Sequence, residues 1–242
     1  MTGAPALRVL LTRPRHDGEE TARLLAKHNI ETVMAPLIDI SEIAGATLDL
    51  AGVQAVLVTS ANGARALAHT TANRDFPVFA VGDASAAAAR DNGFARVTSA
   101  NGDVAALATL VRQRRTPQDG ALVHAAGSAV AGDLAGALES HGFEVRRSQL
   151  YRAQAVDTLP EAARSALSDG IIDAALFYSP RTAALFAKLV VAAGVQSNCR
   201  RIIAGCLSPA VAEAAAALPF AEIRTAQTPD QAALIAVLMD KI

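Results

Sequence analysis

Small hydroxylated side chains, glycines and arginines follow a series of short apolar segments along this chain. They occur in Thr12-Arg13-Pro14, Thr59-Ser60-Ala61-Asn62, Gly82-Asp83, Gly127-Ser128, Tyr178-Ser179-Pro180-Arg181 and Gly205-Cys206. Hydroxyls and glycines at helix starts present free backbone N–H groups, and the helix dipole favours an anion there. Arg13 and Arg181 can add charge-assisted bonds to carboxylates. The pattern predicts a site that holds a polyanion by many weak donors, without one strong catalytic group.

Each of these residues also has an explanation that involves no ligand. Serine and threonine after a strand are most often helix N-caps. Arg13 precedes a proline at a strand end and suits a surface position, and Gly82 and Gly205 permit tight turns. The ligand interpretation is strengthened because both halves of the chain carry such residues on the same expected edge.

An alternation of apolar strands and Ala/Leu-rich helices positions these residues. Strands are predicted at 8–12, 55–59, 78–82, 121–125, 174–178 and 201–205, and further short strands near 96–98 and 222–225. Helices are predicted at about 17–28, 62–70, 84–92, 128–140, 181–193 and 208–217, and near 103–114 and 230–241. Asn29 and Gly142 suit the left-handed conformation at a helix end, and Asp103 and Asp230 are natural N-caps. The strands are expected to be buried on both faces, and ligands of such parallel sheets lie beyond the carboxyl ends of the strands.

The second half of the chain repeats the first in the same order. The matches place Ser60 over Ser179, Gly82 over Gly205, Ser85 over Ser208, Phe94 over Phe220, Leu25 over Leu138, Asn29 over Gly142 and Glu31 over Glu144. Residues 53–68 align with residues 172–187 without a gap. A duplicated unit predicts an α/β fold with two similar lobes and a cleft between them, where small molecules usually bind.

Composition narrows the function further. Hydrophobic residues make up 52% of the 242 residues, enough for two cores, while aromatics are only 4% and tryptophan is absent. The net charge of −1 gives no bulk attraction to nucleic acid or to an anionic membrane. The basic run at 112–115 suits a solvated helix end.

Several kinds of site are not indicated. Cys199 and Cys206 fit no metal spacing and are expected to be reduced and buried, and the five histidines are scattered. The P-loop, the G-x-G-x-x-G motif and the G-x-S-x-G elbow are all missing from the sequence, so neither a nucleotide cofactor nor a hydrolase is supported. No apolar run has signal-peptide flanks or approaches the roughly 20 residues that span a bilayer. We therefore expect a soluble cytoplasmic protein without metal.

A set of short strings occurs in a fixed order along the whole chain. They are LLTRP at 10–14, APLIDI at 35–40, VTSANGARAL at 58–67, AVGDASAAAARDNGF at 80–94, GDVAALA at 102–108, LYRAQ at 150–154, FYSPRTAALF at 177–186 and AGCLSPAVAEAA at 204–215. In this order and spacing the chain resembles the uroporphyrinogen-III synthase family, cofactor-free enzymes that close a linear tetrapyrrole in haem biosynthesis. The resemblance implies two flavodoxin-like parallel-sheet domains, with the cleft between them. One would comprise 1–34 with 156–242 and the other 42–147, joined by connector strands at 35–41 and 148–155.

The resemblance also implies the reaction. The substrate would be hydroxymethylbilane, which bears eight carboxylates and matches the predicted donor-rich edge. Loss of its terminal hydroxyl gives an azafulvene cation, which attacks the substituted carbon of the last ring. The spiro intermediate then rearranges and inverts that ring. Positioning and electrostatics can supply the selectivity.

The resemblance assigns residues to this site. Tyr151 matches the family's connector tyrosine and is the catalytic candidate, hydrogen-bonded to the departing hydroxyl directly or through water; the alternative is an aromatic packed in the hinge. The positions that match expected substrate-binding positions of the family, largely through backbone donors, are Thr12, Arg13, Ser60, Asn62, Gly82, Ser85, Ser179, Ser208 and Thr228. The pattern at the strand ends adds Gly127 and Gly205 to the expected substrate-binding residues. Two features depart from the family: Ser85 and Ser208 replace a common threonine, and the loop 127–133 lacks an arginine often found there.

Other classes of protein remain open at this point. The main alternative is a non-catalytic tetrapyrrole-binding or regulatory protein on the same scaffold, and hydroxymethylbilane turnover distinguishes the two. A bilobal sugar- or amino-acid-binding protein would carry an export signal, and a flavodoxin-like electron carrier would be coloured by its flavin. For the synthase we expect a monomer with a small-molecule substrate and no nucleic-acid or membrane partner.

Overall fold

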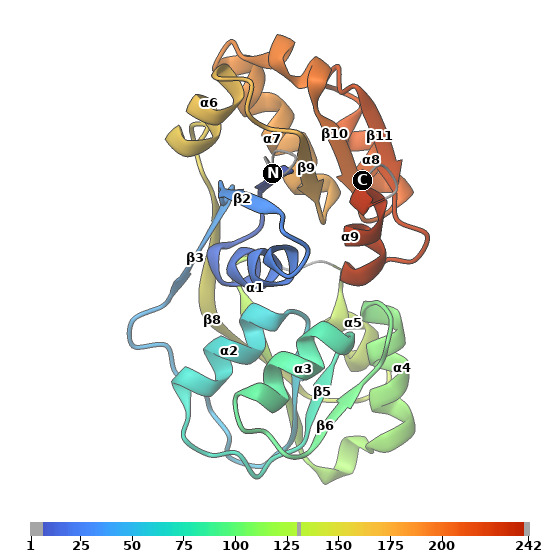
Figure 1. The fold of residues 1–242 in the computed structure, drawn as a ribbon. Helices are drawn as coiled ribbons and strands as arrows, with labels where there is room; N and C mark the ends of the chain where they lie inside the picture. Colours follow the sequence, from blue (N-terminus) through green and yellow to red (C-terminus); the bar gives the residue numbers. More distant parts are fainter. Residues whose placement is uncertain (1–6, 130–131, 240–242) are drawn as a thin grey trace. The chain divides into compact units, whose positions relative to one another are not determined.

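A computed structural model describes residues 7–129 and 132–239 of the chain (Figure 1). The chain divides into two compact units. Unit 1 comprises Met1–Asp39 and Gln154–Ile242, and unit 2 comprises Ile40–Ala153. Each unit contains its own sheet, in which most strands pair in parallel, and its own apolar cores.

Unit 1 is built on a five-stranded parallel sheet. Its strands are β1 (Arg8–Leu11), β2 (Glu31–Met34), β9 (Ala174–Phe177), β10 (Ile203–Cys206) and β11 (Glu222–Thr225). Its helices are α1 (Arg15–Ala26), α6 (Glu161–Ser168), α7 (Pro180–Ala192), α8 (Pro209–Ala215) and α9 (Gln231–Met239), with a 3-10 helix, η2, at Gln196–Arg201. The strands lie in the order β2-β1-β9-β10-β11.

Both faces of this sheet are apolar, because successive strand residues point to opposite sides. Leu10 and Phe177 pack with side chains of α6, α7 and α8. Val9, Leu11 and Leu176 pack on the other face with α1 and α9. The prediction of burial on both faces is confirmed for β1, β9 and β10.

Unit 2 is built on a six-stranded sheet, and the chain passes from one unit to the other within two of its strands, β3 and β8. Its strands are β3 (Ile38–Glu42), β4 (Val53–Val58), β5 (Val78–Ala80), β6 (Val97–Ser99), β7 (Ala121–Gly127) and β8 (Val145–Ala155). Its helices are α2 (Ala61–Thr70), α3 (Asp83–Asp91), α4 (Val104–Arg114) and α5 (Leu134–Glu139), with a 3-10 helix, η1, at Pro117–Asp119. The order is β3-β8-β7-β4-β5-β6, and the strands from β4 to β8 pair in parallel.

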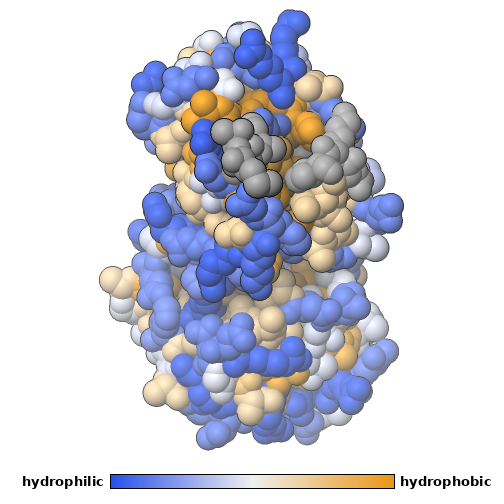
Figure 2. Space-filling model, in the orientation of Figure 1, coloured by the Kyte–Doolittle hydropathy of each residue, from blue (hydrophilic) through white to orange (hydrophobic). Residues whose placement is uncertain are grey.

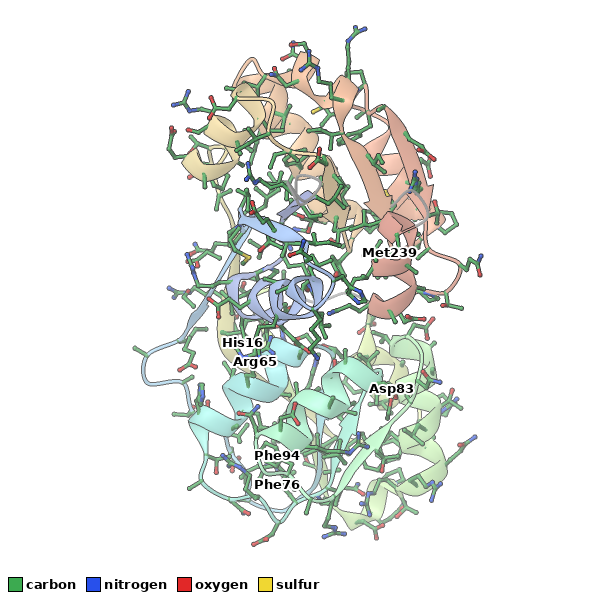
Figure 3. All side chains as sticks on the ribbon, in the orientation of Figure 1. His16, Arg65, Phe76, Asp83, Phe94 and Met239 are labelled. Carbon is green, nitrogen blue, oxygen red and sulfur yellow. The ribbon has the colours of Figure 1, made fainter. Side chains whose placement is uncertain are left out.

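Two helical layers cover the sheet of unit 2. Val56 and Val58 face α2 and α3, which lie side by side (Figure 1). Leu57 faces α4 and α5 on the other side. In the core that α2 and α3 cover, Phe76 and Phe94 lie together, with ring centroids 5.4 Å apart (Figure 3).

The repeat in the sequence is a repeat in the fold. Under the alignment, the order β8-β7-β4-β5-β6 in unit 2 corresponds strand for strand to β2-β1-β9-β10-β11 in unit 1. The two units differ in the origin of one strand-helix-strand segment: β1-α1-β2 precedes unit 2 in the chain, whereas β7-α5-β8 ends unit 2. The strand order therefore reverses at equivalent points, between β1 and β9 and between β4 and β7. In doubly wound sheets such switch points are where ligands bind.

Most predicted elements are confirmed within a few residues. The helix ends were predicted correctly as well: Asn29 has φ 57° and Gly142 has φ 84°. Asp103 accepts a hydrogen bond from the backbone N–H of Ala106, and Asp230 accepts one from that of Ala233.

Two predictions about elements need correction, and two elements were missed. The helix predicted at 128–140 is much shorter, because Asp133 caps α5 and the helix begins only at Leu134; residues 130–131 lie outside the described part. Gly205 lies inside β10, not in the turn that follows it. Strand β2 and helix α6 were not predicted, and the end of the last predicted helix, at 240–241, lies outside the described residues.

No helix within 7–129 and 132–239 is long and apolar enough to cross a bilayer. Figure 2 shows hydrophilic side chains over most of the face drawn, with smaller apolar areas. The large apolar side chains exposed in the described part are Ile171 and Val191.

Candidate functional site

The switch point of unit 2 brings Ser60 and Tyr151 together. Ser60 directly follows the turn after β4 and caps α2, where its hydroxyl accepts a hydrogen bond from the backbone N–H of Gly63 at 2.9 Å. Tyr151 lies on β8 and is 7% exposed. Its hydroxyl is 2.8 Å from Ser60 Oγ, so the two groups are hydrogen-bonded although 91 residues separate them in the chain.

Gly127, the last residue of β7, provides the space for this tyrosine ring. The β7–β8 pairing shifts at this point, so that Ala126 pairs with Gln149 but Gly127 pairs with Tyr151. A Cβ on Gly127 would lie 2.6 Å from Cζ, 2.7 Å from Cε2 and 2.9 Å from Oη of the tyrosine. The ring therefore rests directly against the glycine backbone.

A second polar pair lies on the opposite face of the same strand ends. Thr59 Oγ1 is 3.1 Å from Nε2 of His124, which is 4% exposed on β7. Burial, and secondarily the positive charge of Arg147, lowers the pKa of His124 to about 4. The imidazole is therefore neutral near pH 7. Sequence reasoning missed this residue, although a lone histidine within the apolar strand ALVHA was a usable signal.

Arg147 was also missed by sequence reasoning. Its guanidinium donates to the carbonyl oxygens of Gly127 and Ser128, at 2.9 and 3.4 Å, while its side chain remains exposed. No ion pair joins it to a carboxylate within the described residues. Only the pairing of β7 with β8 brings this cation to the switch point.

Of the other predicted residues of unit 2, Asn62 and Gly82 lie along the same strand edge, whereas Ser85 lies within α3. Asn62 is in the first turn of α2 and accepts a hydrogen bond from Arg65 at 2.6 Å. Gly82 caps α3, and a Cβ there would meet nothing closer than the carbonyl oxygen of Gly102 at 3.9 Å. Ser85 is only 5% exposed within α3, so its hydroxyl is inside the unit.

In unit 1, Arg13 lies at the equivalent switch point. Its guanidinium stacks over the Tyr178 ring at 4.1 Å and donates to Gln231 Oε1 at 2.8 Å. It also contacts Thr21 Oγ1 at 3.3 Å and Asp17 Oδ2 at 3.5 Å. The surface explanation for Arg13 is therefore wrong: the side chain is 20% exposed and links α1 and α9 to the end of β9.

The remaining predicted residues of unit 1 make hydrogen bonds or packing contacts within that unit. Thr12 is buried, and its hydroxyl donates to the carbonyl oxygen of Leu176 at 3.1 Å. Ser179 caps α7 through its side chain, Ser208 occupies the N-cap position of α8 without a side-chain hydrogen bond to the helix, and Thr228 donates to Asp230 at 2.5 Å. A Cβ on Gly205 would lie 2.6 Å from Leu176 Cδ2, so core packing alone explains the glycine.

These contacts show which predicted residues come together. Ser60, Gly127 and Tyr151 form one cluster, with Asn62 on the same helix turn. In unit 1 the predicted residues gather along one edge, apart from Gly205. No group of three or more His, Cys, Asp or Glu side chains that could hold a metal occurs in the described part of the chain.

The sheet order and the helical layers on both faces define a two-unit, doubly wound α/β protein. The structure is similar over almost its whole length to two solved structures. One is a uroporphyrinogen-III synthetase from Helicobacter pylori, with 14% identity, a TM-score of 0.63, and coverage of 96% of this chain and 98% of that one. The other is a mutant uroporphyrinogen III synthase from Thermus thermophilus, with 17% identity, a TM-score of 0.57, and coverage of 97% and 98%. At these identities the similarity shows the fold.

The family follows from a different comparison. A family model described as uroporphyrinogen-III synthase HemD matches residues 19–236. The chain therefore belongs to the uroporphyrinogen-III synthase family, whose members are cyclising lyases of tetrapyrrole biosynthesis. A comparison with curated proteins gave no match. The resemblance and the fold class inferred from the sequence are both confirmed.

Proposed function

We propose that this chain cyclises hydroxymethylbilane to uroporphyrinogen III, with loss of water and inversion of the last pyrrole ring. The observation that carries the proposal is the family match over residues 19–236. The Tyr151 hydroxyl, which is hydrogen-bonded to Ser60 at a switch point, also supports the proposal because it is a group that can take part in the reaction.

Tyr151 is the proposed proton donor to the departing hydroxyl. Ser60 Oγ already accepts the N–H of Gly63, so its own proton is available for the Tyr151 oxygen. The tyrosine O–H can then point away from the serine and donate to the hydroxyl of the substrate. The carbon–oxygen bond breaks, water leaves, and the azafulvene cation attacks the substituted carbon of the last ring. The spiro intermediate then breaks the original bond between that carbon and its methylene bridge. The freed methylene forms a bond to the unsubstituted carbon of the same ring, and the proton lost from that carbon restores the tyrosine.

The carboxylates of the substrate are proposed to bind along the two strand edges. Free backbone N–H groups at the starts of α2, α3 and α7 favour anions. We propose that the following residues take part in this binding, largely through their backbone N–H groups: Thr12, Arg13, Ser60, Asn62, Gly82, Ser85, Gly127, Ser179, Gly205, Ser208 and Thr228. Arg147 is added because its exposed guanidinium lies at the edge of unit 2. Its charge would partly offset the absence of an arginine from the loop 127–133.

The two units are proposed to act as the two domains, with connectors at 35–41 and 148–155 and the substrate cleft between them. We further propose a cytoplasmic monomer with no nucleic-acid or membrane partner. Small-angle scattering with and without uroporphyrinogen III tests the hinge. Closure predicts a smaller radius of gyration with product, and identical profiles at saturation would contradict it. Sedimentation of the unliganded protein measures the oligomeric state.

The activity has a direct test. Hydroxymethylbilane is generated in situ by a deaminase, the protein is added, and the products are oxidised and separated into porphyrin isomers I and III. The proposal expects isomer III to predominate with the protein and isomer I without it. Tyr151→Phe should lower the rate more than it weakens product binding. If protein with native circular dichroism yields only isomer I, the synthase proposal is refuted and the alternative of a non-catalytic tetrapyrrole-binding protein is favoured.

A further inference from the structure

The duplication supplies an internal comparison for Ser60. The alignment places Ser60 over Ser179 and Gly63 over Thr182. Each serine caps an equivalent helix, α2 or α7, and each accepts a hydrogen bond from the backbone N–H three residues later. The two caps therefore make the same contribution to their helices.

The second partner of the serine hydroxyl differs between the units. In unit 1, Ser179 Oγ lies 2.8 Å from Oγ1 of Thr182, on the same helix. In unit 2 the equivalent residue is Gly63, which has no hydroxyl to offer, and Ser60 Oγ lies 2.8 Å from the hydroxyl of Tyr151. Of the two serines, the one in unit 2 is directed toward a tyrosine.

Gly63 and Gly127 also make the space in which the tyrosine lies. A Cβ on Gly63 would be 3.3 Å from Ser60 Oγ and 3.9 Å from Tyr151 Cε1, and only 2.8 Å from the carbonyl oxygen of Ala125. A larger side chain at position 63 would therefore clash with the serine and the tyrosine ring. On its other side the ring meets Gly127, where a Cβ would come within 2.6 Å.

We propose that Ser60 is a positioning residue for Tyr151, and that Gly63 and Gly127 leave the space in which the Tyr151 ring must lie for this contact to form. The Ser60 hydroxyl fixes the tyrosine oxygen and directs its proton outward, so that only the backbone N–H of Ser60 is left for a substrate carboxylate. This inference rests on the proposed function, in which Tyr151 donates the proton. It assigns Ser60 a role different from that of the other hydroxyl residues along the edge.

Kinetics of the full chain separate positioning from binding. Ser60→Ala should lower kcat by roughly 10- to 100-fold, because misplacement of a catalytic group by about 1 Å costs on this scale. Its KM should change less than about twofold, and Ser60→Thr should restore most of kcat. In a Tyr151→Phe background, Ser60→Ala should have no further effect on kcat. A raised KM in Ser60→Ala, or a full additional loss of kcat when Ser60→Ala is combined with Tyr151→Phe, would assign Ser60 to substrate binding and overturn the proposal.

A spectroscopic test does not depend on activity. The chain has two tyrosines, so protein labelled with 3-fluorotyrosine gives two ¹⁹F resonances, and Tyr178→Phe identifies that of Tyr151. Ser60→Ala should shift the Tyr151 resonance. Ser179→Ala, the matched loss of a helix cap in unit 1, should leave it unchanged, and thermal melting compares the stability of the two variants. An unmoved Tyr151 resonance in folded Ser60→Ala would refute the contact. Wild-type protein that produces no isomer III would instead refute the proposed function.

Discussion

Replacing Gly127 by alanine tests the position of the tyrosine ring most directly. The added Cβ would lie 2.6 Å from Cζ of Tyr151, whereas carbon atoms in contact lie about 3.5–4.0 Å apart. The ring must therefore move by roughly 1 Å. Gly127 is not among the glycines with positive φ, so the backbone itself accepts alanine.

The displacement sets the size of two effects. Overpacking costs about 1–3 kcal/mol, and the smaller conformational freedom of alanine in the unfolded chain returns about 0.4–1 kcal/mol. We expect the free energy of unfolding to fall by about 1–2 kcal/mol. Because the hydroxyl is displaced by about 1 Å, kcat for isomer III should fall roughly 100-fold.

Urea unfolding and isomer analysis measure both effects in Gly127→Ala. The control is the same substitution in a Tyr151→Ala background, where the ring that meets the new Cβ is absent. There the additional loss of stability should disappear. A Gly127→Ala protein with wild-type kcat and unchanged stability would show that the ring does not rest on this glycine. An equal loss of stability in both backgrounds would show that the glycine is required for another reason.

Three further predictions follow from burial and capping. His124 has a pKa of about 4 when folded and about 6.5 when unfolded, so the unfolded state binds the extra proton as the pH falls from about 6.5 to 4. The free energy of unfolding should decrease over this range by up to about 3 kcal/mol, and His124→Gln should remove that part of the slope in urea titrations at successive pH values. Burial raises the pKa of the Cys199 and Cys206 thiols to about 11, so neither should react with a disulfide reagent at pH 8 until urea unfolds unit 1; rapid labelling of native protein would contradict their burial. Asp103→Ala removes the cap of α4 and should lower stability by about 1 kcal/mol in urea unfolding, whereas Asp103→Asn should lose much less.

Local signals in the sequence predicted the elements well because their causes are local. Ser60, Ser179 and Asp103 cap helices through bonds to residues only three positions away. Asn29 likewise ends a helix through its own backbone conformation. The alignment of Gly82 with Gly205 misled us, because β10 extends through Cys206 while β5 ends at Ala80.

The contacts of the site depend on distant parts of the chain and could be predicted only in part. The resemblance named Tyr151 and Ser60, and the pattern at the strand ends named Gly127, all as separate positions. Their contact depends on the shifted pairing of β7 with β8, which no local pattern encodes. The neutral state of His124 likewise depends on burial and on Arg147, which lies on a neighbouring strand.

The origin of β1 from the start of the chain has a consequence for synthesis. β1 lies between β2 and β9, and Val9 pairs with Ala174. At 5–20 residues per second, roughly 10–30 s separate the translation of these two partners. All strands of unit 2 emerge during that interval. All strands of the second sheet are thus translated while β1 still lacks β9 and the helices α6 to α9 that cover its two faces, so apolar surface of this first segment stays exposed longest during synthesis.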